Sequence, residues 1–182
     1  HLQRQKDQFN QIYSKGSRQH VISGDKGIKY IVSWRVMQCM KRLLTISKGA
    51  INFNSSILLL CSGDGMEGSI LSDIGYVNVT VSDISEQGVK AALERDSRLK
   101  GMVLNAEHLM LENNAFDVVL LQDGLHHLSS PVNGFTEMLR VASKAVGFLE
   151  PHNSFVGRLI GTKWEKNGSA INYVFRWDKK LV

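Results

Sequence analysis

The stretch that decides the fold is ILLLCSGDGMEG, residues 57–68. It joins four apolar residues directly to a glycine-rich turn and leads into an expected helix over residues 65–74. A short apolar run without alternation is typical of a parallel strand that is buried on both faces. Glycine has no Cβ atom, so this turn would let the backbone come close to a ligand. Its spacing, G-x-G-x-x-G, is weak evidence alone, because a plain tight turn also explains it.

Apolar runs and amphipathic stretches alternate from this turn to residue 150. Further strands are expected over residues 77–81, 102–104, 116–121 and 145–149, and helices over 86–99 and 131–143. In the last of these helices, one face is expected to carry Phe135, Met138, Leu139 and Ala142. Alternation of this kind predicts an α/β fold: a Rossmann-like, doubly wound, mostly parallel sheet with helices on both faces.

The first 50 residues have a different pattern. Apolar side chains of residues 28–44 recur at helical spacing, and this helix is expected to end near Gly49. We therefore expect a helical cap or lid over residues 1–50 and a Rossmann-like domain over residues 51–182. A membrane span needs about 20 mostly apolar residues. The best candidate lies in this helix and contains four Lys or Arg residues, so no span is expected.

The net charge of +5 is distributed unevenly along the chain. It is +8 over residues 1–48, −7 over 49–150 and +4 over 151–182. Such runs of charge are usually a solvated basic surface. They also fit flanks that attract an anionic acceptor toward a site in the acidic centre. Both interpretations stay open.

Two further features favour a cytoplasmic location. Cys39 and Cys61 form neither a metal-binding nor a disulfide pattern, which suits a reducing compartment. Residues 1–20 are polar and charged, unlike a signal peptide.

Each expected strand is followed by a polar or glycine residue. These residues are Ser62 to Gly65 after the first strand, then Asp83, Asn105, Asp123 and Glu150. Ligands of such sheets bind beyond the carboxyl ends of the strands, so these residues should gather at one edge. Asp83 follows Gly65 by 18 residues, a spacing at which a carboxylate accepts the two hydroxyls of a ribose. The alternative is an acid that simply favours the start of a helix.

Six stretches between residues 56 and 151 together resemble the class I S-adenosylmethionine-dependent methyltransferases, especially the small-molecule branch. They are ILLLCSGDGMEG, VTVSDIS, NAEHL, FDVVLLQDGLHHL, EMLRV and FLEP, in the order of that family. The resemblance implies a seven-stranded sheet with an antiparallel last strand and S-adenosylmethionine as cofactor. Three positions depart from the family: Leu59 replaces an acid, Cys61 a glycine and Asn105 a common aspartate. Only 32 residues follow Glu150, so we expect a carboxy-terminal part that is shortened or incomplete relative to that family.

The resemblance also implies a role for each residue at the edge of the sheet. The methionine portion of the cofactor would be lined by Ser62, Gly63 and Gly65, the ribose would be bound by Asp83, and the adenine would meet Ile84, Asn105 and Ala106. Gln122 and Asp123 would border its reactive end. An amino-terminal lid often covers the cofactor in this family. Tyr13 or Arg35 there could contact the methionine carboxylate, and Trp34 could do so or pack in the core.

The expected catalytic pair is His126 as base and Glu150 as its partner. Similar sugar O-methyltransferases use a His after the fourth strand and an acid at the end of the fifth. His is suited to proton transfer near neutral pH. Because neighbouring helical residues point about 100° apart, only one of His126 and His127 should face the site. The alternative is that both merely cap or pack the helix.

Asp123 with either His could also be read as a metal site. Two or three ligands on one loop are too few, and no metal is expected.

The expected function is therefore methyl transfer from S-adenosylmethionine to a small-molecule hydroxyl, for example of a sugar or another secondary metabolite. Basic flanks leave an RNA or other macromolecular methyltransferase as an alternative. Against it, residues 122–125 lack the Asn/Asp-Pro-Pro-aromatic stretch of enzymes that methylate base amines. A nicotinamide-dependent oxidoreductase would share the glycine turn, but the chain has no Tyr-x-x-x-Lys pair. A cofactor-binding protein without catalysis is the last alternative, suggested by Leu59 and Cys61.

Overall fold

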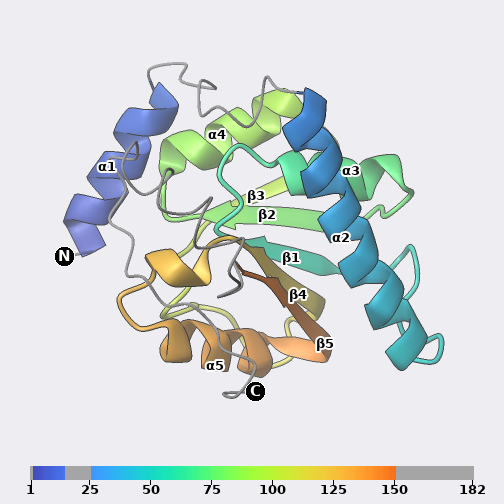
Figure 1. Cartoon of the computed structure of the whole chain (residues 1–182). Helices are drawn as coiled ribbons and strands as arrows, with labels where there is room; N and C mark the ends of the chain where they lie inside the picture. The colour runs from blue at the N-terminus through green and yellow to red at the C-terminus, as the bar shows by residue number, and fades with distance from the viewer. Residues whose placement is uncertain (1, 15–25, 151–182) are drawn as a thin grey trace, which may run out of the picture.

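The computed structural model describes residues 2–14 and 26–150 (Figure 1). Its helices are α1 (Leu2–Ser14), α2 (Lys26–Ile46), α3 (Met66–Asp73), α4 (Glu86–Arg95), α5 (Pro131–Val141) and the short 3₁₀ turn η1 (Leu125–His127). Its strands are β1 (Ile57–Leu60), β2 (Val79–Asp83), β3 (Lys100–Val103), β4 (Phe116–Gln122) and β5 (Ala142–Leu149).

The strands form one parallel sheet in the order β3-β2-β1-β4-β5. The chain builds outward from β1 to β3, then crosses back to place β4 on the other side of β1. Helices cover both faces, with α5 on one and α2, α3 and α4 on the other (Figure 1). The predicted Rossmann-like fold is therefore confirmed. A crossing of this kind leaves a crevice at the carboxyl ends of β1 and β4, where such sheets bind ligands. The sequence also predicts a loop over residues 157–169 and a strand over residues 171–177, and both lie outside the described residues.

The burial of β1 explains its unbroken apolar sequence. All four side chains of this strand are at most 3% exposed. Ile57 and Leu59 belong to the core under α2 and α3, whereas Leu58 and Leu60 belong to the core against α5. Successive side chains of a strand point to opposite faces, so a strand covered on both sides needs apolar residues at every position.

Several element boundaries differ from the sequence predictions. Strand β2 spans Val79–Asp83 rather than residues 77–81, so Asp83 is its last residue and pairs with Val103 of β3. Strand β3 itself begins at Lys100. Helix α4 ends at Arg95 rather than at residue 99, because Asp96 adopts an extended conformation.

The predicted end of helix α5, at residue 143, was also wrong. The helix stops at Val141, and Ala142 begins β5 without an intervening loop. Leu139 does not share the buried face with Met138, because its side chain is 53% exposed.

Helix α2 is part of the main core. Its buried side chains are Val32, Val36, Met40 and Leu43. Ile31, Leu44 and Trp34 are exposed, so Trp34 does not pack in the core. The division of the chain at residue 50 stays a prediction. No helix of the described residues is long and apolar enough to cross a membrane.

We expect Gly65→Ala to lower the free energy of unfolding by about 2–4 kcal/mol, measured by urea denaturation. Gly65 has a φ of +73°, and a Cβ atom there would lie 2.6 Å from the Cβ of Ala92. Gly49→Ala is the matched control, because Gly49 has a φ of +90° with no atom within 4 Å of its added Cβ. It should cost about 1 kcal/mol, the conformational part alone. Equal losses for the two variants would contradict the close packing of α4 on the turn.

Candidate functional site

The backbone is unusual at the carboxyl ends of β1 and β4. Cys61, Gly63 and Gly65 follow β1 with φ values of 53°, 50° and 73°, and Asp123 follows β4 with a φ of 51°. Residues with a side chain rarely adopt this left-handed backbone conformation. This explains why a glycine is usual at the position that Cys61 occupies in this chain. Strained backbone of this kind concentrates at functional sites.

Asp83 holds the glycine turn to the end of β2. One of its carboxylate oxygens accepts a hydrogen bond of 2.9 Å from the Gly63 N–H, and the other accepts one of 2.9 Å from the Ser85 N–H. The side chain is buried, and burial raises its pKa while the backbone donors lower it. Each carboxylate oxygen can accept more than one hydrogen bond, so Asp83 retains acceptors for a further donor.

Other predicted cofactor residues lie at the same edge, and some of them already form hydrogen bonds within the protein. The Ser62 hydroxyl donates a hydrogen bond of 3.1 Å to the Ser82 carbonyl, so it joins β1 to β2. The Asn105 side-chain oxygen accepts a hydrogen bond of 3.0 Å from the Glu107 N–H and shapes the turn that contains the buried Ala106. Ile84 is half-buried between β2 and α4.

Helix α1 lies over the glycine turn. It packs beside α4 (Figure 1), and its Tyr13 ring lies so close that a Cβ atom at Gly63 would overlap with the hydroxyl. Burial, followed by the negative charge of Asp83, raises the pKa of Tyr13 beyond its ordinary range. A ligand that approaches the Gly63 backbone therefore requires the Tyr13 side chain to move.

The same helix connects two loops of the site. The Asn10 side-chain oxygen accepts a hydrogen bond of 2.7 Å from the Ser85 hydroxyl at one end. At the other, the Gln5 amide donates to the His127 carbonyl, and the Phe9 ring meets the His127 ring edge-on at 5.7 Å. Helix α1 therefore contacts both the loop after β2 and the loop after β4.

An ion pair links α2 to the end of β4. The Arg35 guanidinium donates two hydrogen bonds, of 2.5 and 2.9 Å, to the two carboxylate oxygens of Asp123. A bidentate pair of this kind fixes both side chains. It also occupies Asp123, which was expected to border the cofactor.

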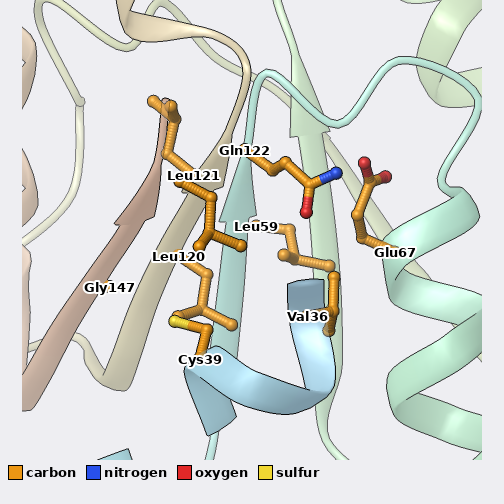
Figure 2. Close-up of a pocket in the computed structure, with 9 residues that line it drawn as sticks. Val36, Cys39, Leu59, Glu67, Leu120, Leu121, Gln122 and Gly147 are labelled. Atoms are coloured by element: carbon orange, nitrogen blue, oxygen red, sulfur yellow. The ribbon is translucent and has the colours of Figure 1, made fainter. Parts of the chain in front are cut away.

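A small pocket lies between α2 and the sheet (Figure 2). Its walls include Val36, Leu59, Leu120 and Leu149, and its polar lining residues are Glu67 and Gln122. Gln122 is only 9% exposed, and its side-chain oxygen is fully buried with no hydrogen-bond partner in the described part of the chain. Burial raises the pKa of the Glu67 carboxyl to about 7, and the charge of Asp64 acts in the same direction.

His126 and Glu150 are in direct contact. The His126 Nδ1 atom lies 2.7 Å from a Glu150 oxygen. The other Glu150 oxygen accepts hydrogen bonds from the backbone N–H groups of Gly124 (2.9 Å) and Leu125 (2.7 Å). The His127 ring lies 4.1 Å from the His126 ring, so the two do not point apart as expected. The described residues contain no group of three His, Cys, Asp or Glu side chains that could hold a metal ion.

The family follows from a comparison with known domains. Residues 58–147 match the model of a methyltransferase domain, from strand β1 into strand β5. These residues form a class I S-adenosylmethionine-dependent methyltransferase domain. No curated protein matches the sequence.

Solved methyltransferases share the fold at low sequence identity. Magnesium protoporphyrin IX methyltransferase from Synechocystis, with bound S-adenosylhomocysteine, is 17% identical with a TM-score of 0.69, over 96% of this chain and 82% of that one. An S-adenosylmethionine-dependent methyltransferase from Thermotoga maritima is 19% identical with a TM-score of 0.67, over 96% and 76%. A Haloferax volcanii methyltransferase, in complex with a methyltransferase activator, is 16% identical with a TM-score of 0.66, over 95% and 71%.

The cofactor of this methyltransferase is S-adenosylmethionine, and the residues at the edge of the sheet fit it. Asp83 retains acceptors for ribose hydroxyls, and Gly63 exposes its backbone once Tyr13 moves. Sequence reasoning missed Glu67, whose position in the first turn of α3 is ordinary for an acid. The signal was its neighbourhood: it follows the glycine turn by two residues in a chain that lacks the family's strand acid at Leu59.

We expect Glu67→Gln to stabilise the methyltransferase without ligand at pH 8 by about 1–3 kcal/mol and to have little effect at pH 4. The folded-state pKa of about 7 exceeds the ordinary value of 4.5, so the fold loses stability as Glu67 ionises between these values. Urea unfolding at both pH values measures the difference. Glu94→Gln, at a side chain 58% exposed, should change neither. A difference independent of pH would contradict the raised pKa of this carboxyl.

Proposed function

We propose that this methyltransferase transfers the methyl group of S-adenosylmethionine to a hydroxyl of a small-molecule acceptor, with His126 as the general base. The observation that carries the proposal is the 2.7 Å contact between His126 Nδ1 and Glu150. A base needs a fixed direction as well as a proton affinity, and Glu150 supplies the direction.

The contacts of Glu150 determine which nitrogen is available. An ionised carboxylate can only accept hydrogen bonds, so His126 Nδ1 carries the proton and Nε2 keeps its lone pair. Two backbone N–H groups hold the carboxylate, whose side chain is only 2% exposed. The His126 side chain is 17% exposed, so the ring is within reach of an acceptor.

The proton balance follows from this arrangement. His126 Nε2 takes the proton of the acceptor hydroxyl as the oxygen forms its bond to the methyl carbon, and Glu150 stabilises the imidazolium. When bound, S-adenosylmethionine supplies a methyl group activated by its positive sulfur and leaves as a neutral thioether. The remaining contribution of the protein is to orient the two reactants and to exclude water.

The cofactor contacts are part of the same proposal. Asp83 binds the ribose hydroxyls, Ile84 packs on the adenine, and Asn105 and Ala106 border the adenine edge. Ser62, Gly63, Gly65, Gln122 and Asp123 surround the methionine end. Arg35 contributes there through Asp123. The basic amino-terminal segment, net +8 over residues 1–48, favours an anionic acceptor.

We expect Asp83→Ala to weaken the binding of S-adenosylhomocysteine at least tenfold, measured by titration calorimetry. The change removes two charge-assisted hydrogen bonds, each worth about 1.5–3 kcal/mol. Asp73→Ala is the control, because Asp73 is an exposed acid at the end of α3 that pairs with Arg98. Unchanged affinity in a folded Asp83→Ala variant would refute the ribose assignment.

We expect His126→Ala to lower the turnover rate by roughly 10²–10⁴ without a change in cofactor affinity. Glu150→Gln should come close to it, because the amide NH₂ would donate to Nδ1 and place the proton on Nε2. His127→Ala is the matched control and should do less. Turnover with an identified acceptor and calorimetry with S-adenosylhomocysteine measure these effects. Near-normal turnover of His126→Ala would mean that orientation alone drives the transfer.

A further inference from the structure

Helix α2 carries apolar side chains on the face that points away from the core. Tyr30, Trp34, Met37 and Leu44 are all exposed, Tyr30 by 70% and Trp34 by 55%. With Lys41 they recur at the spacing of a single helix face, and we call these five residues the outer stripe. Helix α2 runs along the outside of the molecule (Figure 1). A contiguous apolar patch on such a surface marks an interaction site.

The charge around the outer stripe is positive. Helix α2 contains no Asp or Glu. Lys29, Lys41 and Arg42 are exposed, and none of them forms an ion pair with a described residue, whereas Arg35 is bound to Asp123. The net charge is +8 over residues 1–48 and −7 over residues 49–150. A negatively charged surface therefore attracts the side of the molecule that carries α2 and repels the rest.

A second copy of this chain does not fit the outer stripe. Two α2 helices packed through it would bring two sets of unpaired cations together, with no acid on either helix to neutralise them. A protein of another kind would need acids opposite Lys41 and Arg42 and a groove shaped for a convex helix. A lipid surface needs no such groove, because headgroups and acyl chains adapt to the side chains that enter between them.

We propose that the outer stripe of α2 docks this methyltransferase on an anionic lipid surface, with the helix lying in the plane of the headgroups. Tyr and Trp combine an apolar ring with a polar atom, and they concentrate at the boundary of a bilayer. Tyr30, Trp34 and Met37 enter this boundary, while Lys41 and Arg42 extend their charges to the lipid phosphates. This inference goes beyond the proposed function and does not depend on His126.

Flotation with two kinds of vesicle tests the role of charge. The protein should bind vesicles of phosphatidylcholine and phosphatidylglycerol at least tenfold more tightly than vesicles of phosphatidylcholine alone. Lys41→Glu with Arg42→Glu should lower binding to the anionic vesicles at least tenfold. Lys90→Glu with Lys100→Glu is the matched control, because it changes the net charge equally at exposed residues of α4 and β3, at the sheet edge away from α2. Equal binding to both vesicles, or equal losses for the two double variants, would overturn the proposal.

The fluorescence of Trp34 tests whether the stripe enters the lipid. The chain has three Trp residues, so Trp34→Phe identifies the emission of Trp34. Brominated lipid in the anionic vesicles should quench the unmodified protein more than Trp34→Phe. Trp34→Gln should weaken flotation about fivefold or more, because it removes apolar area from the contact. Leu139→Gln, at an apolar side chain that is 53% exposed on α5, should have less than a twofold effect. Identical quenching of the unmodified protein and Trp34→Phe would overturn the proposal.

Two further results would assign the outer stripe to a protein instead. A dimer in analytical ultracentrifugation that Trp34→Gln dissociates would assign it to a second copy. Binding to soluble polyglutamate that Trp34→Gln weakens, without binding to anionic vesicles, would assign it to an acidic protein. Either result would overturn docking on lipid and would leave the proposed methyl transfer untouched, because none of these measurements needs an acceptor.

Discussion

The burial of β1 on both faces is the constraint on which the site depends. A strand with no polar face must pair on both edges, and β1 pairs with β2 on one side and β4 on the other. After β3, the chain crosses back over the sheet, so that β4 can pair with the free edge of β1. That reversal brings the glycine turn after β1 next to Gln122 and Asp123 after β4, so the same apolar residues that form the core also assemble the site.

The sequence was sufficient to predict the strands and the polar residues that follow them. It was not sufficient to predict where each element ends. Five apolar runs with polar residues behind them predicted a parallel sheet, and the sheet carries Asp83 and Glu150 at one edge as expected. The boundary between α5 and β5 could not be read, because Val141 and Ala142 suit either element and no Gly or Pro separates them. Periodicity locates an element more reliably than it locates where the element stops.

The site was predictable to the extent that it lies at strand ends. His126 and Glu150 came from that argument and from the resemblance to a family. Glu67 did not, because its burial arises where α2 covers α3, a contact between segments that no local pattern relates. Tyr13 and Trp34 were indistinguishable as aromatic residues of amphipathic segments, yet Tyr13 packs on Gly63 and Trp34 is 55% exposed. Tertiary packing alone separates them.

Two acids of this site illustrate how one fold gives carboxylates different tasks. Glu150 accepts hydrogen bonds from His126 and from two backbone N–H groups, so its charge is satisfied and its position fixed. Glu67 is also enclosed, but its carboxylate has a hydrogen bond from its own backbone N–H and no ion pair with a described residue, so burial lowers the stability of its ionised form. A satisfied acid can orient a neighbour at little cost, whereas an unsatisfied one destabilises the empty protein. Ionised Glu67 therefore costs the fold stability above its pKa of about 7, whereas the contacts of Glu150 fix the direction of a neighbouring ring.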